Sequence, residues 1–97
     1  MYRSISAKEV KTLIGRVNIL DIRANYLYRL SSIPSSKNIP VNYLLMDPDK
    51  YLNKSDEYYI YCSFGMQSAK ACYELDKKGY KVVNVLGGYN DYLSKYW

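Results

Sequence analysis

The sequence lacks histidine altogether and has only two cysteines, and these two scarcities exclude several kinds of site. Without histidine there is no Ser-His or Cys-His nucleophile pair and no histidine-ligated metal. Two cysteines cannot form a four-thiolate zinc site, and in a chain of 97 residues they are more typical of free thiols than of a disulfide framework. We therefore expect no metal and no cofactor, and a nucleophile of this chain would act without an imidazole base.

Long apolar runs are missing as well. No stretch approaches the roughly 18 apolar residues of a membrane-spanning helix, and the segment from Met1 to Glu9 lacks the apolar centre of a signal peptide. Linkers, repeats and low-complexity tracts are also absent, and 48% hydrophobic with 24% charged residues is typical of a globular chain. These features predict a cytoplasmic monomer with a single domain over residues 1–97 that does not bind membranes.

The charge balance is basic but dispersed. The 14 Lys and Arg residues against 9 Asp and Glu residues give a formal net charge of +5. Because the lysines are scattered along the chain and form no stripe, we do not expect nucleic acid binding. A solvated surface explains most of this charge, and small anionic substrates or an acidic partner surface remain open alternatives.

The hydrophobic pattern predicts strands that alternate with helices from end to end. The clearest signals are helices over residues 6–14, 67–78 and 89–96, and strands over residues 17–22, 58–61 and 81–86. Weaker signals predict helical turns in 25–30 and parts of 43–52, and a short extended piece at 37–39. This alternation predicts an α/β fold, a small parallel sheet of about five strands with helices on both faces.

One cysteine occupies a position that a reactive thiol would require. Cys62 follows the apolar run Tyr58–Tyr61, which fits a strand buried on both faces, and it precedes the strongest predicted helix. In open α/β sheets ligands bind at the carboxyl ends of strands, and Gly65 gives the connecting loop its backbone freedom. Amides of such a loop and of a helix N-terminus favour an anion and would stabilise a thiolate. Position alone leaves a second interpretation equally open, in which Cys62 is a small core side chain.

Cys72 lies on the predicted inward face of helix 67–78, together with Ala69 and Leu75. A resolving thiol for Cys62 would need its Cα within roughly 7 Å of the first cysteine. The helix rises about 6 Å between Ser68 and Cys72, away from the loop. We therefore predict that Cys72 is a core side chain.

Four motifs spread over nearly the whole chain form one pattern. They are Leu20-Asp-Ile-Arg23, Ile33-Pro34 with Asn38-Ile-Pro40, Cys62-Ser-Phe-Gly-Met-Gln-Ser68, and Gly79-Tyr80 with Leu86-Gly-Gly-Tyr89. In order and spacing they resemble the rhodanese-like sulfurtransferases. That family has an Asp-x-Arg strand end, a segment Gly-His-Ile-Pro-Gly-Ala-x-Asn-Ile-Pro, an active-site loop Cys-x-x-Gly-x-Arg-Ser, and a Gly-Gly turn after the last strand. Any one of these motifs is weak, whereas four in register are specific.

The resemblance implies a rhodanese-like fold and a sulfurtransferase that needs no cofactor. The catalytic residue would be Cys62, whose thiolate takes sulfane sulfur from thiosulfate or a persulfide and passes it to a thiol or protein acceptor. The residues implied to bind the donor are Ser63, Phe64, Gly65, Met66, Gln67, Ser68 and Arg23. A non-catalytic rhodanese-like module that binds a partner or carries sulfur is the alternative. A protein-tyrosine-type phosphatase is disfavoured, because it needs a longer loop and an Arg within it.

Two departures from the family pattern bear on the substrate and on a neighbouring loop. Gln67 stands where the family often has Arg, and residues 63–68 contain no basic side chain. Since Gln lacks the charge of a guanidinium, we expect weak use of thiosulfate and a preference for a persulfide or protein donor. Ser32 replaces the family's His, which leaves the packing of that loop open. Arg23, Arg29 and Lys37 are candidates to approach the site, although a surface role is favoured for each.

Overall fold

The computed structural model describes the backbone of residues 1–96 and the side chains of residues 1–94. Within this part of the chain, five parallel strands form one sheet in the order β1-β5-β4-β2-β3. The strands are β1 (Arg3–Ile5), β2 (Asn18–Asp21), β3 (Lys37–Asn38), β4 (Glu57–Tyr61) and β5 (Lys81–Val85). The helices are α1 (Ala7–Leu13), α2 (Asn25–Leu30), α3 (Val41–Met46), α4 (Pro48–Tyr51), α5 (Met66–Lys77) and α6 (Gly88–Tyr96). The predicted parallel α/β architecture is confirmed.

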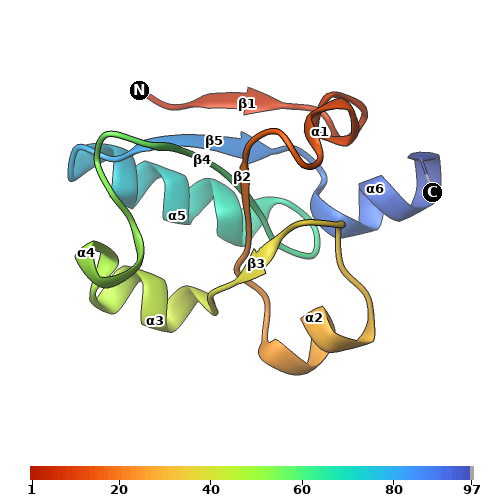
Figure 1. Ribbon diagram of the computed structural model, residues 1–97, viewed down its shortest axis with the longest axis horizontal. Helices are drawn as coiled ribbons and strands as arrows, with labels where there is room; N and C mark the ends of the chain where they lie inside the picture. The colour runs from red at the N-terminus through yellow and green to blue at the C-terminus, as the bar shows by residue number, and fades with distance from the viewer. Residues whose placement is uncertain (97) are drawn as a thin grey trace.

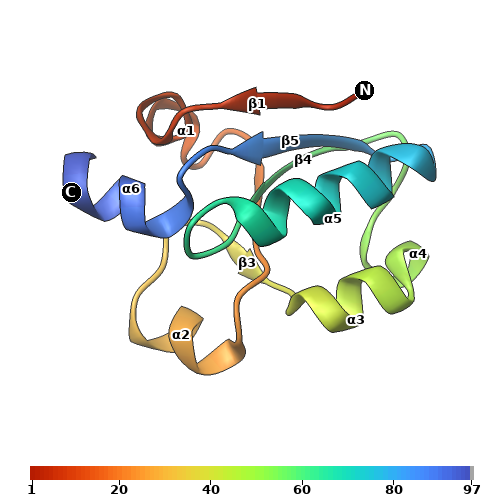
Figure 2. The same cartoon turned by 180° about the vertical axis from the view of Figure 1, so that it is seen from behind.

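Two apolar clusters, one on each face of the sheet, make up the core. Helices cover both faces of the sheet (Figures 1 and 2). Helices α3 and α5 contribute to the first cluster, whereas α1 and α6 contribute to the second. The central strand β4 serves both, because successive side chains point to opposite faces. Tyr58 and Ile60 enter the first cluster, and Tyr59 and Tyr61 enter the second. The continuous apolar run is therefore explained by burial on both sides.

Local signals set several of the element boundaries. Ser6 and Glu9 form a complete capping box at the start of α1, as their spacing predicts. Pro48 opens α4 at its first turn and separates it from α3, so the helical region from 43 onward is two short helices. Helix α5 begins and ends one residue earlier than its pattern predicts, and α6 begins at Gly88.

The sequence pattern missed strand β1, and it placed one residue of α5 on the wrong face. β1 is an edge strand of three residues, Arg3 and Ser4 are exposed, and only Ile5 is buried, so no alternation is visible. On α5 the buried positions are Ser68, Ala71, Cys72 and Leu75, whereas Ala69 is only partly buried. No helix among the residues that the structure describes is long and apolar enough to cross a membrane.

Candidate active site

Cys62 lies at the carboxyl end of β4, and a short loop leads from it into α5. The backbone turns at Gly65, the residue before the helix, which has φ +96° in the left-handed region. A Cβ atom at Gly65 would lie 2.9 Å from the backbone nitrogen of Gly87. Both the dihedral angle and this close approach require glycine. The loop is therefore fixed by its own backbone and by the turn that packs against it.

The loop amides converge on the sulfur of Cys62. The N–H of Gly65 donates to Sγ with an N···S distance of 3.1 Å, and the N–H of Ser68 donates at 3.3 Å. The hydroxyl of Ser68 also lies 3.4 Å from this sulfur. Ser68 belongs to the first turn of α5, where backbone N–H groups have no partner inside the helix. The sulfur therefore receives two fixed donors at the positive end of a helix, an arrangement that stabilises negative charge.

The first turn of α6 holds the loop in this orientation (Figure 2). The N–H of Tyr89 donates to the carbonyl of Cys62 at 2.8 Å, and the N–H of Asn90 donates to the carbonyl of Ser63 at 2.9 Å. A Cβ atom at Gly88 would lie 2.3 Å from the Cys62 carbonyl oxygen, so only glycine allows this approach. Because these carbonyls bond to α6, they point away from the sulfur. The Gly-Gly motif therefore has a physical role in shaping the loop.

Cys62 is buried, whereas apolar side chains that follow it in the chain are exposed. Cys62 is only 2% exposed, whereas Phe64 is 69% exposed and Met66 is 78% exposed. Gln67 is exposed and Ser63 is partly buried. Of the predicted donor-binding residues, Gly65 and Ser68 form the hydrogen bonds to the sulfur. A reagent must be slender to reach it, because bulk solvent scarcely does.

Arg23 is close to the loop but its guanidinium is occupied. Its Nε lies 3.0 Å from both carboxylate oxygens of Asp21, and one terminal nitrogen lies 2.7 Å from Oδ2 of Asp21. That nitrogen also donates to the carbonyl of Ser31 at 2.7 Å, and the group lies 4.3 Å from the ring centroid of Tyr89. Both charged side chains are buried. Arg23 is therefore placed as a structural partner of Asp21 rather than as a free cation.

The hydroxyl of Tyr61 joins this network and anchors the loop that contains Ser32. It donates to Oδ2 of Asp21 at 2.8 Å and accepts from the N–H of Ile33 at 3.1 Å. Ser36 lies 3.1 Å from the same hydroxyl. Burial raises the pKa of Tyr61 well above its usual range, so the group stays neutral. The serine-rich loop is therefore held by Tyr61 of β4, without the histidine of the family pattern. In the sequence, Tyr61 was visible only as one tyrosine inside an apolar run.

A cavity of about 360 Å³ opens beside the loop, between α2 and α3. It is lined by Ile22, Arg23, Ala24, Leu27, Pro40, Val41, Asn42, Ser63 and Gln67. The polar groups are neutral apart from Arg23, which Asp21 neutralises. Arg29 and Lys37 are exposed and do not line this cavity. Two lining residues, Ala24 and Asn42, carried no functional signal in the sequence.

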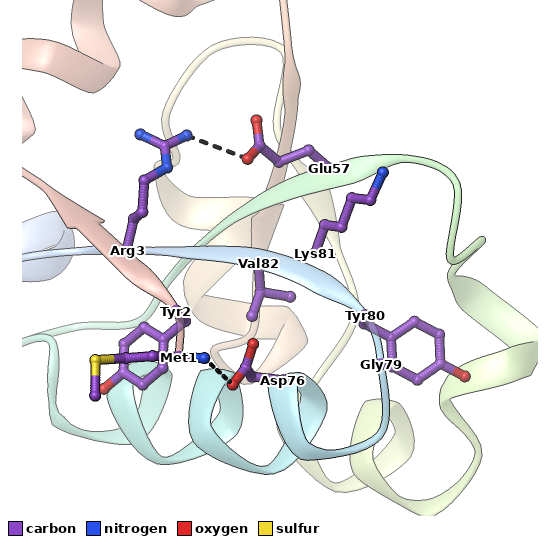
Figure 3. A pocket seen from close by; sticks show the side chains of 9 residues that line it. All are labelled: Met1, Tyr2, Arg3, Glu57, Asp76, Gly79, Tyr80, Lys81 and Val82. Carbon is purple, nitrogen blue, oxygen red and sulfur yellow. Dashed lines mark hydrogen bonds and ion pairs between the residues drawn. The ribbon is translucent and has the colours of Figure 1, made fainter.

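A second cavity, of about 340 Å³, lies at the opposite end of the strands (Figure 3). Arg3 pairs with Glu57 at 3.1 Å, and the amino group of Met1 pairs with Asp76 at 3.0 Å. Lys81, the first residue of β5, also lines it. Exposed ion pairs of this kind contribute little to stability. This cavity is remote from Cys62, which follows the carboxyl end of β4.

Within the part of the chain that the structure describes, Cys72 lacks the backbone N–H donors that surround the sulfur of Cys62. It is fully buried in the apolar cluster beneath α5, and both cysteines are free thiols. Burial, with smaller contributions from the neighbouring Cys62 and Asp76, raises the pKa of the Cys72 thiol to about 12. The prediction of a core side chain is confirmed.

Comparison with known proteins gives one consistent answer. The family model of the Rhodanese-like domain matches residues 6–95. Thiosulfate sulfurtransferase 18 of Arabidopsis thaliana is 31% identical over 101 residues, covering 89% of this chain and 74% of the relative. The chain is also 35% identical to a yeast relative, the adenylyltransferase and sulfurtransferase uba4 of Ogataea parapolymorpha. That match covers 72% of this chain but spans only 18% of the relative.

Solved structures agree with the sequence relatives. A rhodanese-related protein from Thermoplasma volcanium superposes with a TM-score of 0.88 at 31% identity, covering 99% of this chain and 95% of the other. A rhodanese-like domain protein from Staphylococcus aureus gives a TM-score of 0.84 at 33% identity, with 93% and 90% coverage. The fold therefore has well-defined relatives among solved structures.

Proposed function

Because the chain belongs to the rhodanese-like domain family, we propose that it is a sulfurtransferase that moves sulfane sulfur through a persulfide on Cys62. The observation that carries this proposal is the pair of backbone N–H groups directed at one sulfur, at 3.1 and 3.3 Å. These donors stabilise a thiolate and, after transfer, the anionic persulfide. No side-chain base is needed if the thiolate is already formed.

The proposed reaction has two displacement steps. The Cys62 thiolate attacks the outer sulfur of the donor, the donor S–S bond breaks, and its electron pair leaves on sulfite or on a thiolate. Cys62–S–S⁻ remains in the loop. An acceptor thiolate then attacks the outer sulfur, the S–S bond of the persulfide breaks, and the electron pair returns to Cys62. Charge and electrons balance in both steps without an external oxidant.

A persulfide is the favoured donor, and thiosulfate is a weak one. The loop from 63 to 68 has no basic side chain, and Gln67 at the cavity edge is neutral. Arg23 is already paired with Asp21, so it offers little to a sulfonate group. An alkyl persulfide of a small molecule or of a protein requires no such cation, and a cavity lined by neutral residues apart from the paired Arg23 suits its uncharged body.

A non-catalytic binding or sulfur-carrying module is the second candidate. The observation in its favour is that Cys62 is only 2% exposed, while the nearby residues Phe64 and Met66 are exposed apolar side chains. A surface of this kind is typical of contact with another protein. In this alternative the fold is kept, and the chain binds a partner or holds sulfur without catalysing its transfer to an acceptor.

Mass spectrometry of the intact chain distinguishes the two candidates. After mixing with thiosulfate or with a small alkyl persulfide, a transferase gains the mass of one sulfur atom, and an acceptor thiol removes it. The gain is lost in Cys62→Ala and kept in Cys72→Ala, the matched control. The absence of an adduct with every donor would leave the binding module as the function.

The cellular setting follows from the same chemistry. We place the chain in the cytoplasm as a monomer, because a persulfide cycle requires thiols that stay reduced and both cysteines are free. A donor and an acceptor bound at one loop require no second subunit. Residues 1–97 then act as one domain.

A further inference from the structure

Ser68 and Asn84 form a buried polar pair directly behind the sulfur of Cys62. Ser68 is fully buried and Asn84 is 3% exposed, although Asn84 lies within the apolar strand β5. The Ser68 hydroxyl donates to Oδ1 of Asn84 with an O···O distance of 2.5 Å. The same oxygen lies 3.4 Å from Sγ of Cys62. A buried polar side chain in such a strand requires a partner, and among the described residues this hydroxyl is the one that hydrogen bonds to the Asn84 side chain.

A serine hydroxyl has one proton, so its neighbours compete for it. Because the proton points to Asn84, Ser68 presents only lone pairs to the sulfur. The resting contact is therefore one in which the thiol of Cys62 donates to the Ser68 oxygen. The two backbone donors act on the sulfur throughout, whereas the Ser68 hydroxyl does not.

We infer that Asn84 is a positioning residue that controls, through Ser68, how readily Cys62 forms a thiolate. By accepting the Ser68 proton, Asn84 withholds a third donor from the sulfur. Its removal would let the hydroxyl turn toward Cys62 and favour the anion. The inference deepens the proposed function, on which its role in sulfur transfer rests.

A second acceptor, the carbonyl of Gly65, determines how strongly the released Ser68 hydroxyl stabilises the thiolate of Cys62. The Ser68 hydroxyl also lies 3.3 Å from the carbonyl oxygen of Gly65, one helical turn back. Once released from Asn84, the proton is shared between that neutral carbonyl and the sulfur of Cys62. The Gly65 carbonyl is a much weaker competitor than Asn84, because its contact of 3.3 Å is far longer than the 2.5 Å contact to Oδ1 of Asn84. A hydrogen bond to an anion is also roughly twice as strong as one to a neutral group. The hydroxyl therefore turns to the sulfur when the thiolate is present, and it stabilises that form.

The test is a titration of the Cys62 thiolate by its ultraviolet absorbance. Each variant is measured against the same variant with Cys62→Ala, which subtracts Cys72 and the 13 tyrosines. Asn84→Val suits a buried strand and removes the acceptor. It should shift the midpoint to lower pH, with about tenfold more thiolate at a pH well below the parent midpoint. Asn84→Asp keeps an acceptor and adds negative charge, so it should shift the midpoint to higher pH.

Repeating the titration in a Ser68→Ala variant tests whether Asn84 acts on Cys62 through the Ser68 hydroxyl. There Asn84→Val should leave the midpoint unchanged, because no hydroxyl remains to be released. A shift to lower pH that persists in this background would overturn the inference. A parent-like or higher midpoint for Asn84→Val would do so as well, since it would mean that Asn84 donates to Ser68. A purely structural residue would lower the melting temperature and leave every midpoint in place.

This titration needs neither a sulfur donor nor turnover. If the midpoints shift as expected while no sulfur adduct forms, the proposed function fails and the role of Asn84 stands. If adducts form while the midpoints stay in place, the proposed function stands and the role of Asn84 fails.

Discussion

The two cysteines are both buried and lie ten positions apart, yet their surroundings differ in one decisive respect. Cys62 receives two backbone N–H donors, whereas Cys72 is enclosed by apolar side chains. Burial penalises the anion at both positions, and only Cys62 has groups that compensate for it. Low exposure alone therefore does not identify an inert thiol. The direction of the surrounding amides is what separates a candidate nucleophile from a core residue.

The strongest way to break this comparison is to remove each thiol in turn. Cys62→Ala should abolish sulfur loading completely, whereas Cys72→Ala should keep it within about twofold and lose some stability from the small cavity it leaves. Intact mass after incubation with an alkyl persulfide measures the loading. Loading that persists in Cys62→Ala would remove the distinction between the two sites.

Removing the turn should have the next largest effect. Gly65→Ala introduces a Cβ atom 2.9 Å from Gly87 at φ +96°, so we expect the N–H groups to turn off the sulfur. The rate of sulfur transfer should fall by about 100-fold, with a loss of about 1–3 kcal/mol in the free energy of unfolding.

Gly15→Ala is the matched control for this change. Gly15 has φ +81° but no atom within 4 Å of an added Cβ, so the variant should lose stability without losing activity. Equal activity losses in the two variants would show that the loop geometry is not special.

Adding a positive charge to the Cys62 loop should increase activity, in contrast to the losses expected from the preceding variants. Gln67→Arg should improve the use of thiosulfate by about tenfold, because a guanidinium makes charge-assisted bonds to the sulfonate. The use of an alkyl persulfide should change little. Steady-state kinetics with both donors provide the measurement, and Lys70→Arg is the control for a cation that lies outside the loop. Unchanged thiosulfate kinetics would mean that position 67 does not face the donor.

The smallest expected effect is the pH dependence of stability that Cys72 causes. Its pKa is about 12 in the folded chain, raised by burial from an ordinary value of 9.0. Between these values the folded state keeps the proton that the unfolded chain has lost. The free energy of unfolding should therefore fall as pH rises through this interval, by at most about 1.4 kcal/mol per pH unit.

Urea unfolding of the parent and of Cys72→Ala at several alkaline pH values tests this prediction. The variant should show a shallower decline than the parent. Tyr61, whose pKa is also raised by burial, contributes the decline that both chains share above about pH 10. Parallel declines in the two chains would contradict a buried, neutral Cys72 thiol.

The sequence was most informative where local chemistry alone determines the structure. The capping box at Ser6, the alternation through β4 and the glycine before α5 all depend on residues close in the chain, and each was predictable. Cys62 could be identified as a candidate because a strand end and a helix start flank it. The edge strand β1 was not predictable, because its pairing with β5 spans nearly the whole chain and only Ile5 is buried.

The parts of the candidate site that escaped prediction depend on contacts between distant segments. Arg23 was a candidate for donor binding; its partner Asp21 is only two residues away, but nothing local indicated that Ser31 and Tyr89 would also contact it. Asn84 is noticeable in the sequence as the single amide in an apolar strand, but its partner Ser68 lies on another element. Such pairs become visible only when the sheet brings α5 and β5 together.

The most direct test of the central claim is the pH dependence of Cys62 alkylation in the Cys72→Ala variant. The folded chain and the urea-unfolded chain are compared, so that the same thiol serves as its own reference. Because the loop amides stabilise the thiolate, the relative alkylation rate of the folded chain should persist to lower pH than that of the unfolded chain. A folded-state rate that falls off at the same pH as the unfolded one, or at a higher pH, would contradict the account.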